Sequence, residues 1–185
     1  STPCLWGTEP GSLVAEYLRS SPDQTGRVVY DLGCGEGKNS AVFAASGASV
    51  RAIDCSALAI ANGKAAWPDL AINWQVENVE KALEEVPPSI ADVVVCYGLF
   101  HCLKGEAEIT RLIGHAKRIT APQGIHIVVA FNDGEHDLSA HPGFSPTLLA
   151  HAKYLQLYGD WEIMSATDSL LHETHPHNNI PHFHS

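Results

Sequence analysis

The chain has 185 residues, of which 45% are hydrophobic, and this is enough apolar material to bury the core of one domain. Its formal net charge of −10 disfavours nucleic acid as a partner, because binding to phosphate backbones depends on Lys and Arg. No apolar run reaches the ~20 residues that cross a bilayer, no basic and apolar leader begins the chain, and the cysteines form no CxxC pair. We therefore expect one cytoplasmic domain over residues 1–185, with neither a membrane nor a nucleic acid as its partner.

The first half of the chain alternates between strand-like and helix-like segments. Arg27–Leu32 is a short β-branched run that ends in glycines, which is typical of a buried strand. Ser56 is a favourable N-cap for a helix that Pro68 prevents from continuing. The pattern predicts strands over residues 27–32, 48–53 and 71–76, helices over residues 38–45 and 57–66, and a lid or helix within residues 1–20.

The middle of the chain continues this alternation. Asp92–Tyr97 is the most continuous apolar run and is typical of a buried strand. Residues 106–120 carry apolar side chains three and four positions apart, which predicts a helix with one buried face. Pro122 and Gly124 interrupt the pattern before a fifth strand over Ile125–Phe131. Such alternation implies right-handed crossover units, and therefore a doubly wound α/β domain with a mostly parallel sheet.

We expect residues 27–131 to form a cofactor-binding core and residues 132–185 to form the substrate side of the same domain. A helix is predicted near residues 145–158, followed by strands over residues 161–167 and 180–185. Two consecutive strands after a helix indicate an antiparallel hairpin at the C-terminal end. These strands bring the predicted sheet to seven strands, and we expect the end of the chain to cut the last one short.

The most informative segment is Asp31-Leu-Gly-Cys-Gly-Glu-Gly-Lys-Asn39, which follows the first predicted strand. Its three alternate glycines, Gly33, Gly35 and Gly37, allow a sharp turn and let a ligand approach the backbone where a Cβ atom would clash. Ligands of open α/β sheets bind at the carboxyl ends of the strands. Asp54 ends the second predicted strand there, and its carboxylate is able to accept hydrogen bonds from both hydroxyls of a ribose.

Two other nucleotide-binding loops do not match this segment. The dinucleotide fingerprint G-x-G-x-x-G needs a third glycine three positions after the second, where the two possible registers place Lys38 and Ser40. A Walker A loop needs a Gly-Lys-Ser/Thr ending, which the segment lacks. A nicotinamide or flavin cofactor is therefore disfavoured, and a tight turn without any ligand is the remaining alternative.

The spacing Asp-x-Gly-x-Gly-x-Gly after a strand, with an acid closing the next strand, resembles the S-adenosylmethionine site of class I methyltransferases. The resemblance implies that S-adenosyl-L-methionine is the cofactor. It also implies that Asn78, where Asp is usual, meets the adenine, and that Tyr97 begins the segment facing the transferred methyl group. The implied cofactor-binding residues are Asp31, Gly33, Cys34, Gly35, Gly37, Asn39, Asp54, Cys55, Asn78, Val79 and Tyr97.

A closer resemblance is to the tellurite-resistance (TehB-like) methyltransferases of bacteria, which methylate tellurite and selenite. Near the start of the chain it rests on Cys4-Leu-Trp-Gly, on Glu9-Pro10 and on the loop sequence DLGCGEGKNS. Late in the chain it rests on Phe144-Ser-Pro-Thr-Leu-Leu, on Asp160-Trp-Glu162 and on Leu171-His-Glu-Thr174. The resemblance therefore covers most of the chain.

This sequence departs from that family at two basic positions. His172 matches a family histidine, but Glu173 stands where the family has a basic residue. A further family arginine before the last strand is absent, with Ile180 nearby instead. Because arginine is the usual bidentate partner of an oxyanion, the resemblance implies the fold and the cofactor more strongly than a tellurite substrate.

The candidate catalytic residues follow from the chemistry of methyl transfer. Displacement at the carbon of a sulfonium needs orientation and a dry site, and a soft acceptor such as selenium, tellurium or thiolate needs no strong base. A hydroxyl or amine acceptor needs its proton removed, for which histidine is the common base near neutral pH. His101, after the fourth predicted strand, and His172 are the candidates, with hydrogen-bonded structural histidines as the alternative.

We therefore expect an enzyme that transfers a methyl group from S-adenosylmethionine to a small-molecule acceptor, with selenium, tellurium or thiol species considered first. An O- or N-methyltransferase acting on a small organic metabolite, with a histidine base, is the alternative within the enzyme class. The sequence does not indicate an oligomeric state.

The C-terminal end is rich in histidine, with five of the chain's 11 histidines at positions His172, His175, His177, His182 and His184. In an extended chain each His-x-His pair projects to one face, which is good ligand geometry for a metal. The metalloprotease spacing H-E-x-x-H does not occur, because Pro176 stands at the position of its second histidine. We assign no metal ligand and expect a solvated or substrate-lining cluster, with a His-rich metal-binding module on the same fold as the alternative from another class.

Overall fold

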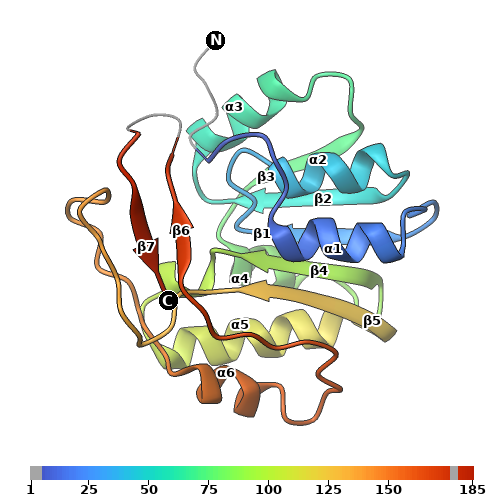
Figure 1. Ribbon diagram of the computed structural model, residues 1–185. Coiled ribbons are helices and arrows are strands. Elements are labelled where there is room, and N and C mark those ends of the chain that lie inside the picture. Colours follow the sequence, from blue (N-terminus) through green and yellow to red (C-terminus); the bar gives the residue numbers. More distant parts are fainter. Residues whose placement is uncertain (1–5, 176–178) are drawn as a thin grey trace.

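The centre of the computed structural model, which describes residues 6–175 and 179–185, is a five-stranded sheet in which every pairing is parallel (Figure 1). The strands are β1 (Val28–Leu32), β2 (Ser49–Asp54), β3 (Ile72–Val76), β4 (Ala91–Tyr97) and β5 (Thr120–Val129). Their order is β3-β2-β1-β4-β5. The winding direction therefore reverses between β1 and β4, and the crevice at the carboxyl ends of these two strands is where such sheets bind ligands.

Helices cover both faces of the sheet, as the doubly wound prediction requires (Figure 1). They are α1 (Ser12–Ser20), α2 (Lys38–Ala45), α3 (Ala57–Ala66), α4 (Val79–Glu84), α5 (Glu106–Ile119) and α6 (His151–Leu157), with a short 3₁₀ helix over Phe100–Cys102. Successive residues of β4 point to opposite faces, so that Val93 joins the core beneath α1 and α2, whereas Val94 joins the core beneath α4 and α5.

Two helices show how closely local sequence determines these elements. The predicted helix over residues 57–66 is confirmed as α3, and the hydroxyl of Ser56 accepts a hydrogen bond from the Ala59 amide at 3.2 Å. The helix α5 buries Ile109, Leu112 and other residues at the predicted spacing. Its first turn carries acidic residues and its last turn carries basic ones, an arrangement that stabilises the helix dipole.

The prediction of a seven-stranded sheet was wrong. The main sheet has five strands, and β6 (Leu171–Glu173) pairs only with β7 (His182–His184) in a separate antiparallel sheet among the described residues. Residues 161–167 form no strand, because the indole of Trp161 packs against the rings of His126 and Tyr158, with ring centroids 4.3 and 5.9 Å away. The expected C-terminal hairpin is thus present, but its first strand begins ten residues later than the predicted start at 161.

Two other predicted boundaries differ from the structure. The helix expected near residues 145–158 begins only at His151, because Thr147 hydrogen-bonds through its amide to the His101 carbonyl and through its hydroxyl to the Leu103 carbonyl. The strand β5 starts at Thr120 rather than at residue 125. The break expected around residues 122–124 is instead a shift in register against β4, with Gln123 at φ 65°.

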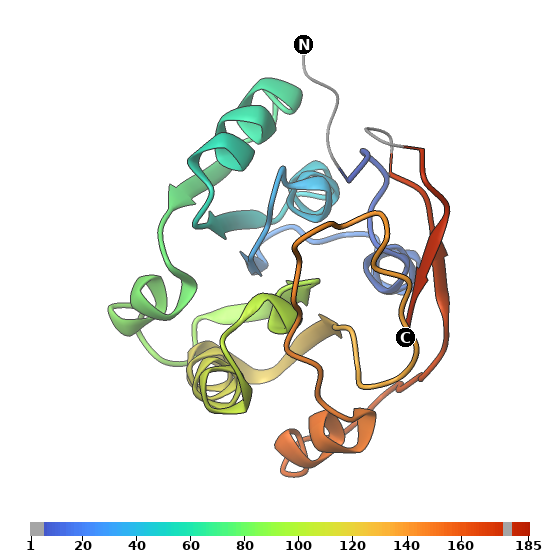
Figure 2. The same ribbon diagram turned by 90° about the vertical axis from the view of Figure 1, so that its left-hand side faces the viewer.

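The hairpin β6–β7 and the segment before α6 lie at the carboxyl end of the sheet, which faces the viewer in Figure 2. The Asn132 amide donates to the Ser185 carbonyl at 2.9 Å, and His136 pairs with His184 in an isolated antiparallel bridge. These contacts join the loop after β5 to the last strand of the chain. No helix among the described residues is both long and apolar enough to span a bilayer.

Candidate functional site

The glycine loop lies at the carboxyl end of β1, beside the point where the strand order reverses. Gly33, Gly35 and Gly37 have φ values of 67°, 55° and 77°, which side chains rarely adopt. A Cβ atom on Gly33 would lie 2.8 Å from Leu99, and one on Gly37 would lie 2.2 Å from Trp74. On Gly35 the nearest neighbour would be Trp6 at 3.8 Å, so Gly35 is the glycine whose backbone a ligand is free to approach.

Asp54 lies beside that open glycine. One of its carboxylate oxygens accepts a hydrogen bond from the Gly35 amide at 2.8 Å, and the other accepts one from the Ser56 amide at 2.8 Å. Each carboxylate oxygen has lone pairs for more than one bond. The structure therefore brings together the loop and the acid that the sequence analysis paired, and it fixes the carboxylate before any ribose binds.

Asp31 supports the loop from inside the protein. The side chain is buried, and the Ser40 hydroxyl donates to it at 2.6 Å. Burial raises the pKa of Asp31 to about 6, although the hydrogen bond from Ser40 acts in the opposite direction. This carboxyl group holds α2 to the end of β1, which makes Asp31 a residue that positions the loop.

The buried Asp31 makes stability depend on pH. Its folded pKa of about 6 lies above the ordinary 3.8, so the ionised form is disfavoured in the fold, and stability is lost as pH rises from about 4 through about 6. We expect Asp31→Asn to raise the free energy of unfolding by about 2–3 kcal/mol at pH 7.5. Urea titrations of both proteins at several pH values measure this difference.

The comparison at low pH is the control for this prediction. Near pH 4 the wild-type carboxyl group is protonated and resembles the amide of Asn, so the two proteins should have nearly equal stability. Histidines titrate in both proteins alike and therefore cancel in the difference. A difference that stays constant between pH 4 and pH 7.5 would contradict the role given to Asp31.

Asn39 and Tyr97, both expected to bind the cofactor, hold the N-terminal segment in place. The Asn39 side-chain oxygen accepts from the Gly11 amide at 2.8 Å, and the Tyr97 hydroxyl accepts from the Ser12 amide at 3.2 Å. Gly11 is required there, since a Cβ atom would lie 2.2 Å from the Tyr97 ring. The helix α1 that follows packs against the sheet through Val14. Trp6, which precedes this segment, lies 3.8 Å from the Cβ position of Gly35 in the glycine loop.

Asn78 and Val79, also expected at the cofactor site, follow β3 at the carboxyl end of the same sheet. Asn78 caps α4, a helix that the sequence analysis missed, and its oxygen accepts from the amides of Glu80 and Lys81 at 2.9 and 3.2 Å. The side-chain nitrogen of Asn78 is a donor that the cap does not use. Val79 is buried, and its apolar side chain forms no hydrogen bonds, so only its backbone is able to bind a polar ligand group. The Asx motif Asn-Val-Glu was the signal that could have revealed this helix.

Two cysteines expected at the cofactor site differ in their exposure. Cys55 is exposed after Asp54, whereas Cys34 is partly buried within the glycine loop. Burial raises the pKa of the Cys34 thiol, which therefore stays protonated and is a poor nucleophile. Cys4, which contributed to the family resemblance, lies outside the described residues.

His101 is buried after β4, in contact with the loop that follows β5. Its Nδ1 accepts a hydrogen bond from the Phe131 amide at 3.0 Å, and its ring stacks on that of Phe131 with centroids 3.8 Å apart. Burial, followed by the nearby His184, lowers the pKa of His101 to about 4. At neutral pH the ring is therefore uncharged and carries its proton on Nε2, which makes Nε2 a hydrogen-bond donor.

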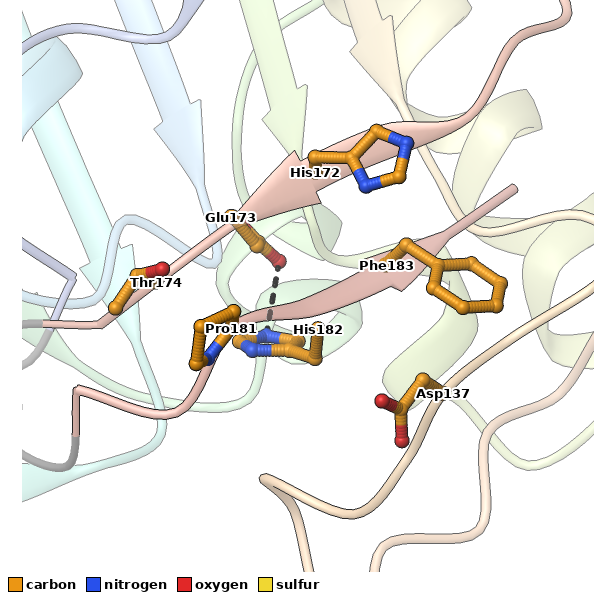
Figure 3. A pocket seen from close by; sticks show the side chains of 7 residues that line it. All are labelled: Asp137, His172, Glu173, Thr174, Pro181, His182 and Phe183. Carbon is orange, nitrogen blue, oxygen red and sulfur yellow. Dashed lines mark ion pairs between the residues drawn. The ribbon is translucent and has the colours of Figure 1, made fainter.

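His172, the second candidate, lies on the hairpin and lines a pocket of about 390 Å³ there (Figure 3). Its ring is exposed and lies 5.9 Å from that of Phe183, whereas the neighbouring Glu173 points toward His182. Alternation along β6 thus places His172 and Glu173 on opposite faces. The structure does not bring His172 together with His101, and Glu173 is the residue of this strand that faces the interior.

Three histidines of the expected C-terminal cluster, His175, His182 and His184, are buried at this end of the sheet, where they meet a histidine that the sequence analysis did not connect with them. His141 lies in the loop before α6, and its Nε2 is 3.2 Å from that of His182 and 3.3 Å from that of His175. Trp6 contacts the His175 ring edge-on, with centroids 4.6 Å apart. His141 carries no spacing signal relative to the C-terminal histidines, and His177 lies outside the described residues.

An α/β sheet with a glycine loop at its switch point, and an acid at the end of the next strand, defines the class of enzymes that bind a nucleoside cofactor. Residues 30–128 match the family described as a methyltransferase domain, which is more than half of the chain. The chain therefore belongs to this methyltransferase family. The expectation of a methyltransferase is confirmed at the level of the family.

Solved structures show the same fold. TehB from Haemophilus influenzae aligns with a TM-score of 0.73 and 21% identity over 94% of this chain. A structure from work on the conversion of a disulfide bond into a thioacetal group during echinomycin biosynthesis aligns with a TM-score of 0.70 and 20% identity over 100% of this chain and 85% of that one. The 1,6-didemethyltoxoflavin-N1-methyltransferase of Burkholderia thailandensis, with bound S-adenosylhomocysteine, aligns with a TM-score of 0.63 and 16% identity over 94% of this chain and 75% of that one.

The alignment with TehB covers only 60% of that protein's own length. No curated protein matched the sequence significantly. The comparisons therefore establish the family and the fold, and the methyl acceptor has to be argued from the site itself.

Proposed function

We propose that this protein transfers the methyl group of S-adenosylmethionine to a small-molecule acceptor with a soft nucleophile, a thiol or a selenium or tellurium species. The observation that carries the proposal is the open backbone at Gly35, whose amide is held by Asp54 beside the strand reversal. The cofactor supplies an electrophilic methyl group, and the protein supplies orientation and exclusion of water.

The residues at the crevice fit this cofactor. The space that a Cβ atom of Gly35 would take has no close neighbour, so the amino-acid end of the cofactor is able to approach the loop. Asp54 has lone pairs left for a ribose after accepting two amide bonds. Asn78, which caps α4, keeps its side-chain nitrogen for an acceptor on the adenine.

The state of His101 supports a soft acceptor. An imidazole that accepts from the Phe131 amide and carries its proton on Nε2 is not able to remove a proton from a hydroxyl or amine. A thiol or selenol ionises without such help, so this site suits it better. Glu173 faces the interior at the position where the TehB-like family has a basic residue, so a tellurite or selenite oxyanion has one cation fewer to bind it.

The structural neighbours include proteins described by different acceptor chemistries. TehB carries the family resemblance seen in the late part of the sequence, and the echinomycin neighbour is described by chemistry at sulfur. The toxoflavin neighbour methylates a ring nitrogen, so the same fold also serves nitrogen acceptors. The test must therefore compare acceptor classes directly.

The decisive experiment has two stages. Isothermal titration with S-adenosylhomocysteine tests the cofactor, and absence of binding at high micromolar concentration would refute the proposed function. Incubation with S-adenosylmethionine and a panel of small thiols, selenite, tellurite, phenols and amines then identifies products that have gained one methyl group by mass spectrometry. Methylation of phenols or amines alone would favour the O- or N-methyltransferase alternative.

The dependence of kcat/KM on pH distinguishes whether His101 acts as a hydrogen-bond donor or as a general base. Because the pKa of His101 is about 4, we expect no titration of His101 in kcat/KM between pH 6 and pH 8. His101→Asn keeps a side-chain acceptor for the Phe131 amide and should leave the shape of the profile unchanged. A wild-type decline in activity below pH 7 that the variant lacks would instead identify His101 as the general base.

A further inference from the structure

Four imidazoles and one carboxylate from three separate segments meet beneath the hairpin β6–β7. We call these residues the histidine cluster, and they are His141, Glu173, His175, His182 and His184. The last three are buried, and His184 is 0% exposed. Burying several polar side chains together is costly unless each of them has a partner. The cluster lies apart from the residues expected to bind the cofactor, so the cofactor does not supply those partners.

The distances within the cluster match those between ligands of one metal ion. The Nε2 atoms of His141, His175 and His182 form a triangle with sides of 3.2, 3.2 and 3.3 Å. Tetrahedral coordination with metal–nitrogen bonds of about 2.0–2.1 Å requires nitrogen atoms about 3.3 Å apart. Oε1 of Glu173 lies 3.6 Å from the His182 nitrogen and 3.9 Å from the His175 nitrogen, so this carboxylate faces two of the three nitrogens.

Backbone carbonyls determine which ring nitrogens carry protons. Nδ1 of His182 lies 2.7 Å from the Ile180 carbonyl and must donate to it, which leaves a lone pair on Nε2. Nε2 of His136 donates to the Asn132 carbonyl at 2.8 Å, so its Nδ1 accepts from Nδ1 of His184 at 3.4 Å. The Nε2 of His184 is therefore also left with a lone pair.

These lone pairs converge on a carboxylate. Nε2 of His184 has no hydrogen-bond partner among the described residues, and it lies 3.7 Å from Oε1 of Glu173. Nε2 of His182, which is likewise an acceptor, lies 3.6 Å from the same oxygen. An unpartnered buried imidazole acceptor that faces a carboxylate, as Nε2 of His184 does, is costly, and a cation between the two groups removes that cost.

We propose that the histidine cluster binds one Zn²⁺-class cation, with Nε2 of His141, His175 and His182 and a carboxylate oxygen of Glu173 as its ligands. Imidazole nitrogen selects borderline transition metals over Ca²⁺ and Mg²⁺, which prefer oxygen. The nitrogen of His184 faces the same carboxylate and is the adjacent fifth donor. The ion fastens the hairpin to the loop that carries His141.

The site also adjoins the glycine loop. Trp6 lies against the His175 ring on one side and 3.8 Å from the Cβ position of Gly35 on the other. The ion therefore shapes the wall of the crevice that faces the acceptor. This inference goes beyond methyl transfer, and metal binding is measured without the cofactor.

The experiment uses the whole chain, purified without an affinity tag and stripped with a chelator. We expect titration with Zn²⁺ to give one site per chain that survives dialysis, and Co²⁺ to give the visible absorption bands of a tetrahedral complex. His182→Gln and Glu173→Gln should each weaken Zn²⁺ binding at least about 100-fold, since even residues behind the ligands cost 10–100-fold.

His172→Gln is the matched control. It removes a histidine from the same hairpin, but from the exposed face opposite Glu173, and it should change Zn²⁺ affinity less than about twofold. Equal loss in His172→Gln and His182→Gln, or no stoichiometric Zn²⁺ in the wild-type protein, would overturn the proposal. Titration with S-adenosylhomocysteine verifies that each variant is folded, and it separates failure of this site from failure of the proposed methyl transfer.

Discussion

Gly35→Val is expected to abolish binding of S-adenosylmethionine, with an affinity at least about 1,000-fold lower, or about 4 kcal/mol. The substitution places a branched side chain where, among the described residues, the loop has only Trp6 within 4 Å. It also forces that side chain into a backbone with φ 55°, so the Gly35 amide is expected to leave its bond to Asp54. Isothermal titration with S-adenosylhomocysteine measures the loss.

Gly26→Val is the control for that variant. Gly26 also has a positive φ, 79°, and open space around its Cβ position, but it lies in the turn before β1. It therefore suffers the same kind of backbone strain away from the crevice, and should lower stability while leaving cofactor affinity unchanged. If both variants bind the cofactor normally, the crevice has been placed wrongly.

Asp54→Ala is expected to lower cofactor affinity about 1,000-fold. Two charge-assisted hydrogen bonds to the ribose hydroxyls are lost, each contributing about 1.5–3 kcal/mol. The substitution also frees the amides of Gly35 and Ser56, which lose the acceptor that fixes the loop. The same titration measures the effect, and retained affinity would show that this carboxylate does not touch the cofactor.

Ser56→Ala separates these two effects. The Ser56 hydroxyl caps α3 by accepting from the Ala59 amide, while its own amide still donates to Asp54. The variant should lose about 1 kcal/mol of stability through the missing cap and should keep its affinity for S-adenosylhomocysteine. A large loss of affinity in Ser56→Ala would mean that Asp54→Ala acts by loosening the loop instead of through the ribose.

The core of the fold was predictable because local sequence patterns and tertiary packing agree there. Apart from the missed helix α4, the strands and helices from Val28 to Ile119 appear close to their predicted boundaries, and Ser56 caps the helix it was expected to cap. The later part was less predictable, because residues 161–167 look like a strand locally while Trp161 is held by ring contacts with His126 and Tyr158. Tertiary contacts decided that segment.

The contact between Gly35 and Asp54 was predictable from the order of the strands. Gly35 and Asp54 lie together as expected, since the carboxyl ends of β1 and β2 are neighbours in any such sheet. Asn39 and Tyr97, by contrast, contact residues before α1, and no pattern in the sequence announces that pairing. The same holds for His141, which reaches the C-terminal histidines only through the fold.

The indole of Trp6 lies between the proposed metal site and the proposed cofactor site, because it contacts His175 and lies near the glycine loop. With 45% of its surface exposed, this ring is free to adjust to whatever fills either side. If a ligand on one side moves this ring, it changes the free energy of binding on the other side, and such linkage is reciprocal. Whatever factor the metal contributes to cofactor affinity, the cofactor must contribute to metal affinity in equal measure.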